Sequence, residues 1–260
     1  MADFVEILGI ELNNVALEEA ATRIEQLSES QPFSFTCTAN IDHFVKLQHD
    51  SEFREIYERA DLVVADGVPV TWAARFLGTP LKDRVNGTDL FELLVARASE
   101  RRASVFLLGG DDGVAEIAAA RLKQKYPALH VAGVHCPPFG FESSAEYNQK
   151  IKDMIACVRP TYLFVGLGAP KQEKWIAAHA AATGARHAIG IGVSFSFVAK
   201  RIRRAPRWMQ RTGFEWLWRL GSEPRRLWRR YLVEDPRFFW LVLNQKLGRW
   251  RSPIASRESA

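Results

Sequence analysis

Tyr-Leu-Phe-Val-Gly-Leu-Gly-Ala-Pro-Lys-Gln-Glu-Lys-Trp, residues 162–175, contains the unit from which most of the chain is built. Four apolar residues form a run of strand length, and two glycines and a proline follow as a turn. A segment with the composition of a helix then extends from residue 171 to 182. A strand that passes through a tight turn into a helix is half of a βαβ unit, so this stretch predicts a parallel sheet covered by helices.

The same alternation recurs along the chain. Strand-like apolar runs occupy residues 33–37, 62–65, 105–108, 130–134, 162–165 and 187–191. Helical segments occupy residues 17–27, 41–49, 90–98, 113–125, 145–156 and 171–182. The pattern predicts an α/β protein, Rossmann-like, with a mainly parallel sheet and helices on both faces. Residues 5–10, followed by Asn13 and Asn14, predict an antiparallel strand or hairpin at an edge.

The C-terminal fifth has a different composition. Residues 200–251 contain 2 Lys and 13 Arg against 4 acidic residues, a net charge of +11, together with six of the eight tryptophans. The whole chain has a net charge of +5 and Arg257 cancels Glu258, which leaves −6 for residues 1–199. We therefore expect an α/β domain over 1–199, a basic helical appendage over 200–251 and a flexible tail over 252–260. Breaks at 221–224 and 234–236 predict about three helices in the appendage.

This charge asymmetry favours an anionic partner. Arginine and tryptophan together are typical of protein segments in the headgroup layer of a membrane. Nucleic acid is the alternative polyanion. A third interpretation is that the appendage is a helical subdomain that packs on the body. The longest apolar run of the appendage, residues 238–243, is too short to span a bilayer. An acidic N-terminus without an apolar signal region, and three cysteines without paired spacing, favour a reduced cytoplasmic compartment. We expect a peripheral protein on the inner face of the plasma membrane.

Candidate site residues follow the strands. In a parallel α/β sheet, ligands bind beyond the carboxyl ends of the strands, where polar residues and glycines gather in this chain. These residues are Thr38 and Asn40, Asp66, Gly109 and Gly110, and Gln172. The Gly109-Gly110 turn suits a phosphate, because bare N–H groups and a helix N-terminus would face the anion. Residues 84–89 look like a helix start with Thr88 or Asp89 near the cap.

Several activities are disfavoured by missing motifs. Gly166-Leu167-Gly168 lacks the third glycine and the acidic residue of a dinucleotide site, which argues against an oxidoreductase. No zinc, P-loop or serine-hydrolase motif is present. The adjacent Asp111 and Asp112 diverge and have no evident third ligand, so we expect no metal and no cofactor.

Four body segments and the appendage together resemble the WecG/TagA/CpsF glycosyltransferase family over about residues 5–245. The body segments are Thr38-Ala39-Asn40, residues 65–69, residues 84–90 and residues 166–175. The appendage contributes residues 204–206, 215–220, 223–226 and 230–231. The Gly-Ala-Pro-Lys-Gln-Glu and Glu-Trp-Leu-Trp-Arg stretches are the most specific of these.

The resemblance implies a bacterial inverting transferase of the hexosyl or N-acetylhexosaminyl type. It would move a sugar from a UDP- or GDP-linked donor to a polyprenyl-diphosphate-linked glycan in exopolysaccharide or wall-polymer synthesis, without a metal. Nucleic acid is not expected as a partner. A nucleic-acid-binding α/β protein that uses the basic appendage nevertheless stays the alternative function. The sequence is also compatible with an oligomer. The donor sugar and the acceptor linkage stay open.

The resemblance also implies roles for residues. Asp66 matches the proposed base, and Thr38 and Asn40 match residues that flank the acceptor hydroxyl. Substrate-binding positions are matched by Arg84, Asn86 and Gln172, and lipid-diphosphate-binding positions by Arg219, Arg226 and Arg229. The last two arginines, three apart, would share one face of a helix.

The chemistry fits this assignment. Partial burial after an apolar strand would raise the pKa of Asp66 and make it a better base. Without a metal, the departing diphosphate needs cations and N–H donors, which we expect from Arg84 and the Gly109-Gly110 turn. One loop departs from the family pattern, because Ser196 stands where an aspartate is common and Lys200 where a glycine is common.

Overall fold

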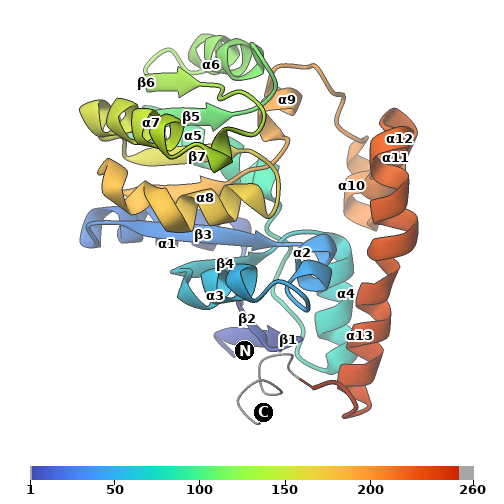
Figure 1. Cartoon of the computed structure of the whole chain (residues 1–260). Coiled ribbons are helices and arrows are strands. Elements are labelled where there is room, and N and C mark those ends of the chain that lie inside the picture. The colour runs from blue at the N-terminus through green and yellow to red at the C-terminus, as the bar shows by residue number, and fades with distance from the viewer. Residues whose placement is uncertain (1, 252–260) are drawn as a thin grey trace.

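A six-stranded parallel sheet forms the centre of the computed structural model, which describes residues 2–251 (Figure 1). Its strand order is β4-β3-β8-β7-β5-β6, and all neighbours are parallel. The strands are β3 (Ser34–Ala39), β4 (Leu62–Ala65), β5 (Ser104–Gly109), β6 (His130–His135), β7 (Tyr162–Gly166) and β8 (His187–Gly190). All six strands expected from the sequence are confirmed.

Helices cover both faces of the sheet, as predicted. They are α1 (Leu17–Ser30), α2 (Ile41–Lys46), α3 (Ser51–Arg59), α4 (Val68–Leu77), α5 (Gly87–Arg101), α6 (Val114–Lys125), α7 (Ala145–Val158), α8 (Lys171–His179) and α9 (Ser194–Val198), with short 3₁₀ turns η1 (Phe141–Ser143) and η2 (Ala180–Thr183). Alternate strand residues enter two separate cores. Cys37 and Leu163 join the core with α2, α3, α7 and α8, whereas Val64 and Phe164 join the core with α1, α5, α6 and α9.

The N-terminal hairpin lies beside the sheet without joining it. Strands β1 (Phe4–Ile7) and β2 (Ile10–Asn13) pair with each other antiparallel as a separate two-stranded sheet. The Val63 N–H of edge strand β4 donates to the side chain of Asn13 at 2.8 Å. The hairpin is thus held to the edge by a side chain instead of a backbone ladder.

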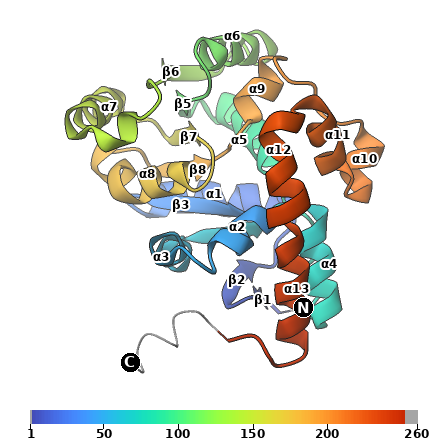
Figure 2. The same cartoon turned by 45° about the vertical axis from the view of Figure 1, so that its right-hand side comes forward.

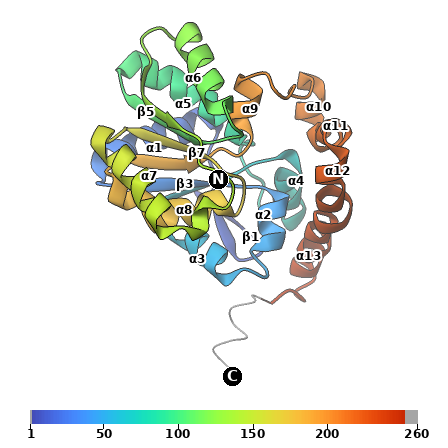
Figure 3. The same ribbon diagram turned by 45° about the horizontal axis from the view of Figure 1, so that its top comes forward.

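The appendage forms a column of helices opposite the carboxyl ends of the strands (Figures 1 and 2). It consists of α10 (Arg207–Thr212), α11 (Glu215–Ser222), α12 (Pro224–Arg229), a π-helical turn η3 (Arg230–Glu234) and α13 (Pro236–Lys246). The segment after α9 leads from the body to this column (Figure 3). The break expected at 234–236 coincides with the boundary between η3 and α13, where Pro236 is the first residue of α13, although Asp235 keeps a helical backbone with φ −60° and ψ −34°.

Apolar packing fixes the column to the body. Phe238 of α13 is fully buried in the first core, and its ring centroid lies 5.4 Å from that of Phe44 in α2. Helix α13 also contacts α4, and the Lys246 ammonium donates to the Leu77 carbonyl at 3.1 Å. The appendage therefore shares its core with the body. The flexible tail expected at 252–260 lies outside the described residues.

Candidate active site

A cleft of about 1100 Å³ lies between the carboxyl edge of the sheet and the helical column. The ends of β3 and β8 open into it, where neighbouring strands come from distant parts of the chain and their connections diverge. Body and appendage both line it. Of the residues expected from the sequence, the cleft lining includes Thr38, Asn40, Asp66, Arg84, Asn86, Gly110, Gln172, Arg219 and Arg226.

Asp66 lies at the floor of this cleft, directly after β4. Its backbone N–H donates to the Ala39 carbonyl at 2.8 Å, which extends the β3–β4 pairing by one residue. The Asn86 amide donates to one carboxylate oxygen at 2.9 Å. An ideal Cβ at Gly87 would lie 3.6 Å from the other carboxylate oxygen, so the first residue of α5 lies close to the acid.

Opposing influences set the proton affinity of Asp66. Burial raises its pKa to about 6, and the negative charge of Glu215 adds to the rise. Arg84, the Gly87 N–H and the Asn86 amide act in the opposite direction. A carboxylate with a pKa near 6 is ionised at neutral pH and is a stronger base than an exposed aspartate.

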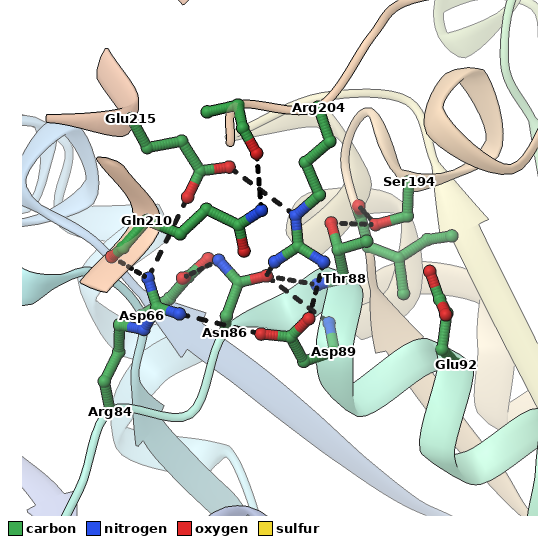
Figure 4. Close-up of polar contacts among 12 residues, drawn as sticks. Asp66, Arg84, Asn86, Thr88, Asp89, Glu92, Ser194, Arg204, Gln210 and Glu215 are labelled. Carbon is green, nitrogen blue, oxygen red and sulfur yellow. Dashed lines mark hydrogen bonds and ion pairs between the residues drawn. The ribbon is translucent and has the colours of Figure 1, made fainter. Parts of the chain in front are cut away.

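The appendage braces the neighbours of Asp66 (Figure 4). The Arg204 guanidinium donates to Asn86 at 3.0 Å and to Asp89 at 2.5 Å. Glu215 of α11 lies 3.8 Å from Arg204 and 3.9 Å from Arg84. The Arg84 side chain in turn donates to the Gln210 carbonyl of α10 at 3.0 Å. The column is therefore part of the site that holds the carboxylate.

Asn86 is the N-cap of α5, where the sequence suggested Thr88 or Asp89. Its side-chain oxygen accepts from the N–H groups of Thr88 and Asp89 at 3.0 and 3.3 Å. The same amide donates to Asp66, so one side chain caps the helix and orients the acid. These hydrogen bonds of Asn86 are all formed with other groups of the protein.

Thr38 and Asn40 flank the cleft as the sequence suggested. Thr38 is the penultimate residue of β3 and lies near Asp66, since both side chains approach Gly87. Asn40 is the N-cap of α2, where its side-chain oxygen accepts from the His43 N–H at 3.1 Å. Its amide nitrogen is therefore the end that can donate to a ligand.

Both polar atoms of the Gln172 side chain, which lines the cleft, form hydrogen bonds within the protein. It is buried, its amide nitrogen donates to Glu173 at 2.7 Å, and its oxygen accepts from the Gly192 N–H at 3.0 Å. An ideal Cβ at Gly190 would lie 2.6 Å from this amide nitrogen. Gln172 thus fixes the loop after β8, at the edge of the cleft.

The Gly109-Gly110 turn has a structural explanation. The Gly110 N–H donates to the Gly166 carbonyl at 2.8 Å, so it is not free to bind a phosphate, contrary to our expectation. Gly109 has φ +103° and an ideal Cβ there would lie 2.7 Å from the Gly166 oxygen. The two glycines allow close approach of the β5 and β7 ends.

The three appendage arginines lie differently. Arg219 and Arg226 line the cleft, and Arg226 pairs with Glu223 at 3.0 Å. The Arg219 Nε is buried without a hydrogen-bond partner among residues 2–251. The side chain of Arg229 is 76% exposed, pairs with Glu234 at 3.2 Å and does not belong to the cleft lining, whereas Arg230 does.

Within the described range, no group of three or more His, Cys, Asp or Glu residues is arranged to hold a metal ion. Positive charge at the cleft instead comes from side chains. These are Arg84, Lys171, Arg219, Arg226 and Arg230.

The family model for the WecG/TagA/CpsF glycosyl transferases matches residues 5–252. The chain belongs to this family. A Bacillus spizizenii relative named N-acetylglucosaminyldiphosphoundecaprenol N-acetyl-beta-D-mannosaminyltransferase is 29% identical over 213 residues, covering 82% of this chain and 80% of the relative. A Staphylococcus aureus protein of the same name is 29% identical over 244 residues, 93% of each chain.

Family membership confirms the resemblance inferred from the motifs and the glycosyltransferase class. Two residues of this chain, Ser196 and Lys200, depart from the pattern that is common in the family. Ser196 is buried and lines the cleft, and Lys200 adopts φ +56°, a left-handed conformation that costs a non-glycine residue about 1 kcal/mol. Sequence reasoning assigned no role to Arg204 or Glu215, although both stand within the matched segments of the appendage.

Proposed function

We propose that this glycosyltransferase moves an N-acetylhexosamine from a nucleoside-diphosphate sugar to a polyprenyl-diphosphate-linked sugar. The names of the two relatives specify N-acetylmannosamine transfer to N-acetylglucosaminyl-diphosphoundecaprenol. The observation that carries the proposal for this chain is Asp66, a carboxylate with a pKa of about 6 at the floor of a large cleft. The donor nucleotide is a uridine or guanosine diphosphate.

The reaction would be a single displacement that inverts the anomeric carbon. An acceptor hydroxyl beside Thr38 and Asn40 gives its proton to Asp66 as its oxygen bonds to that carbon. The bond from the anomeric carbon to the donor diphosphate breaks, and the nucleoside diphosphate leaves with the electron pair. Cationic side chains along the cleft stabilise this charge, so the reaction needs no metal ion.

The acceptor diphosphate is assigned to Arg219 and Arg226. Both line the cleft on the column side, and the buried Nε of Arg219 has no hydrogen-bond partner in the described part of the chain. A diphosphate would supply acceptors for both guanidinium groups. For Arg229 the family-based role stays a prediction, because its side chain pairs with Glu234 outside the cleft lining.

The column also offers a surface suited to the cytoplasmic face of the plasma membrane. None of the helices in residues 2–251 is long and apolar enough to cross a membrane. Large apolar side chains are nevertheless exposed on α4 and along the column. They are Trp72, Phe76, Trp208, Leu217, Trp228, Leu232, Trp240 and Leu247. Together with the excess of arginine, they suit peripheral binding to an anionic leaflet.

The test is transfer itself. Wild-type protein is assayed with UDP- and GDP-linked N-acetylhexosamines and a synthetic lipid-diphosphate N-acetylglucosamine, with and without excess EDTA. We expect transfer that EDTA does not abolish, and Asp66→Asn should lower kcat by at least ~10²-fold with the fold intact. Normal turnover by folded Asp66→Asn would remove Asp66 from the mechanism. Loss of activity in EDTA with rescue by Mg²⁺ or Mn²⁺ would show that a metal takes part.

A further inference from the structure

Four charged side chains meet where the column touches the body. Arg230 of the π turn lies 3.5 Å from Asp42 of α2 and 3.8 Å from Asp235. Lys46 of α2 pairs with the same Asp42 oxygen at 2.8 Å. Two cations therefore face two carboxylates, and Arg230 and Asp235 line the cleft.

The polar groups of this junction are incompletely bonded. Asp235 is only 2% exposed, and neither of its carboxylate oxygens has a hydrogen-bond partner among the residues that the structure describes. The same holds for the Arg230 Nε. A separation of 3.8 Å is too long for a hydrogen bond between them. Buried polar groups are nearly always satisfied, so this cluster is built to bond something more.

The chemistry of the cluster restricts its ligand. The ionised carboxylate only accepts and the guanidinium only donates, so a group that bonds to both must donate and accept, as a hydroxyl does. The two acids balance the two bases, which favours a neutral ligand over a phosphate. Tyr231 and Trp216, whose ring centroids lie 6.1 Å apart, line the same cleft and offer apolar faces.

We propose that Asp235 and Arg230 bind hydroxyl groups of the acceptor sugar. The inference rests on the proposed function and assigns the sugar, as distinct from its diphosphate, to the π turn. Helix α2 connects the two ends of this arrangement. It begins at Asn40, which we place beside the reacting hydroxyl, and it carries Asp42 and Lys46 toward Arg230. A sugar held by Arg230 and Asp235 would lie in the same cleft as Asp66.

The electrostatics of Asp235 agree with this placement. Burial raises its pKa to about 7, Arg230 opposes the rise, and Asp42 adds to it. A sugar hydroxyl that donates to the carboxylate would stabilise its charged form and replace the water that burial has removed.

The test combines protein variants with altered acceptors. Lipid-diphosphate N-acetylglucosamine analogues, each lacking one hydroxyl other than the accepting one, are compared with the full acceptor. The proteins are wild type, Asp235→Asn and Arg230→Lys. Glu234→Gln is the matched control, because it removes the neighbouring carboxylate, which pairs outward with Arg229.

We expect one analogue to lower kcat/KM of the wild type by about tenfold or more, since a site built for a hydroxyl rejects a substrate that lacks it. Asp235→Asn should lower kcat/KM for the full acceptor to a similar degree and leave the donor KM unchanged. When Asp235→Asn is given that analogue in place of the full acceptor, its kcat/KM should fall by less than about a further threefold. Such non-additivity identifies a direct contact. Glu234→Gln should behave as wild type with every acceptor.

Fully additive losses for both Asp235→Asn and Arg230→Lys would overturn the inference and leave the cluster as a structural junction. If Asp235→Asn does not fold, Arg230→Lys decides by the same comparison. A wild type that uses every deoxygenated acceptor as well as the full one would also overturn it. These outcomes differ from a failure of the proposed function, in which the wild type transfers no sugar even to the full acceptor.

Discussion

Asp66 combines a partly buried position with charged neighbours of both signs. The acid must lose its proton before it can accept one from the substrate, so kcat/KM should rise through pH ~6 and level off above it. Glu215 raises the pKa of Asp66, and Glu215→Gln should therefore move the midpoint of the profile to lower pH. The profile is measured with a buffer series at constant ionic strength. An unchanged midpoint in Glu215→Gln would contradict this account of the site.

The buried side chain of Glu173 lowers the free energy of unfolding when it is ionised. Burial raises its pKa to about 7, and one of its oxygens has no hydrogen-bond partner within residues 2–251. Its unfolded pKa is ~4.3, so the native state binds more protons between these values and Glu173 destabilises the fold increasingly as pH rises. Gln at this position can keep the contact with Gln172.

Glu173→Gln should therefore stabilise the protein, on the order of 3 kcal/mol at pH 8 and less than ~1 kcal/mol at pH 5. Urea unfolding of wild type and variant at both pH values measures the difference. A gain that is equal at pH 5 and pH 8, or larger at pH 5, would show that burial does not raise the pKa of Glu173 in the native state.

At the scale of the element, the helical column separates arginines that the sequence pattern groups together. Arg226 and Arg229 are three residues apart within α12, which suggested one shared face, but only Arg226 belongs to the cleft lining. Arg226 and Arg230, four apart, line the cleft, while Arg229 is mostly exposed. Helical spacing alone could not reveal this, because residues three and four apart are both neighbours on a helix, and the docking of the column decides which side chains meet the cleft.

Two alanine variants test which face binds the acceptor. Arg219→Ala should raise the acceptor KM about tenfold or more, since it removes a charged donor from the cleft. Arg229→Ala should change it by less than about twofold, because that side chain pairs outside the lining. Initial rates at varied acceptor and saturating donor provide the comparison, and the donor KM is the internal control. Equal losses in the two variants would support the family-based role of Arg229.

Elements were predictable where one physical signal dominated. Five of the six sheet strands are buried on both faces and have short, mainly apolar sequences, whereas the edge strand β6 is only partly buried. Helix α4, by contrast, was not predicted, because Val68-Pro69-Val70-Thr71-Trp72 combines proline with residues of high strand propensity. Its helical form depends on tertiary packing of Val70 and its neighbours, which the local sequence does not contain.

The site was predictable only in part for the same reason. Thr38 and Asp66 could be placed together, because the carboxyl ends of parallel strands meet at one edge. The contact between Arg204 and Asn86, 118 residues apart, depends on how the column docks. That docking follows from the burial of Phe238, which in the sequence is the first residue of the apolar run 238–243 and gives no indication of the residues it packs against.

At the scale of the whole molecule, the acidic body and the basic column predict how the protein meets a membrane. Each Lys or Arg near an anionic leaflet contributes on the order of 1 kcal/mol, and this attraction weakens as salt shortens the screening length to below ~8 Å. Insertion of exposed tryptophan is apolar and keeps its strength in salt. The two contributions can therefore be separated by experiment.

Binding to liposomes with and without anionic lipid, at low and high salt, measures both. We expect binding to anionic vesicles that falls with salt. Trp240→Ser, at a side chain that is 65% exposed, should weaken it about tenfold at either salt concentration, since the loss of apolar burial is worth ~1.4 kcal/mol or more. The control is Val158→Ser, an apolar side chain on α7 that is 40% exposed and belongs to the body. If Val158→Ser weakens binding as much as Trp240→Ser, the column is not the membrane-binding surface, and its arginines serve the cleft alone.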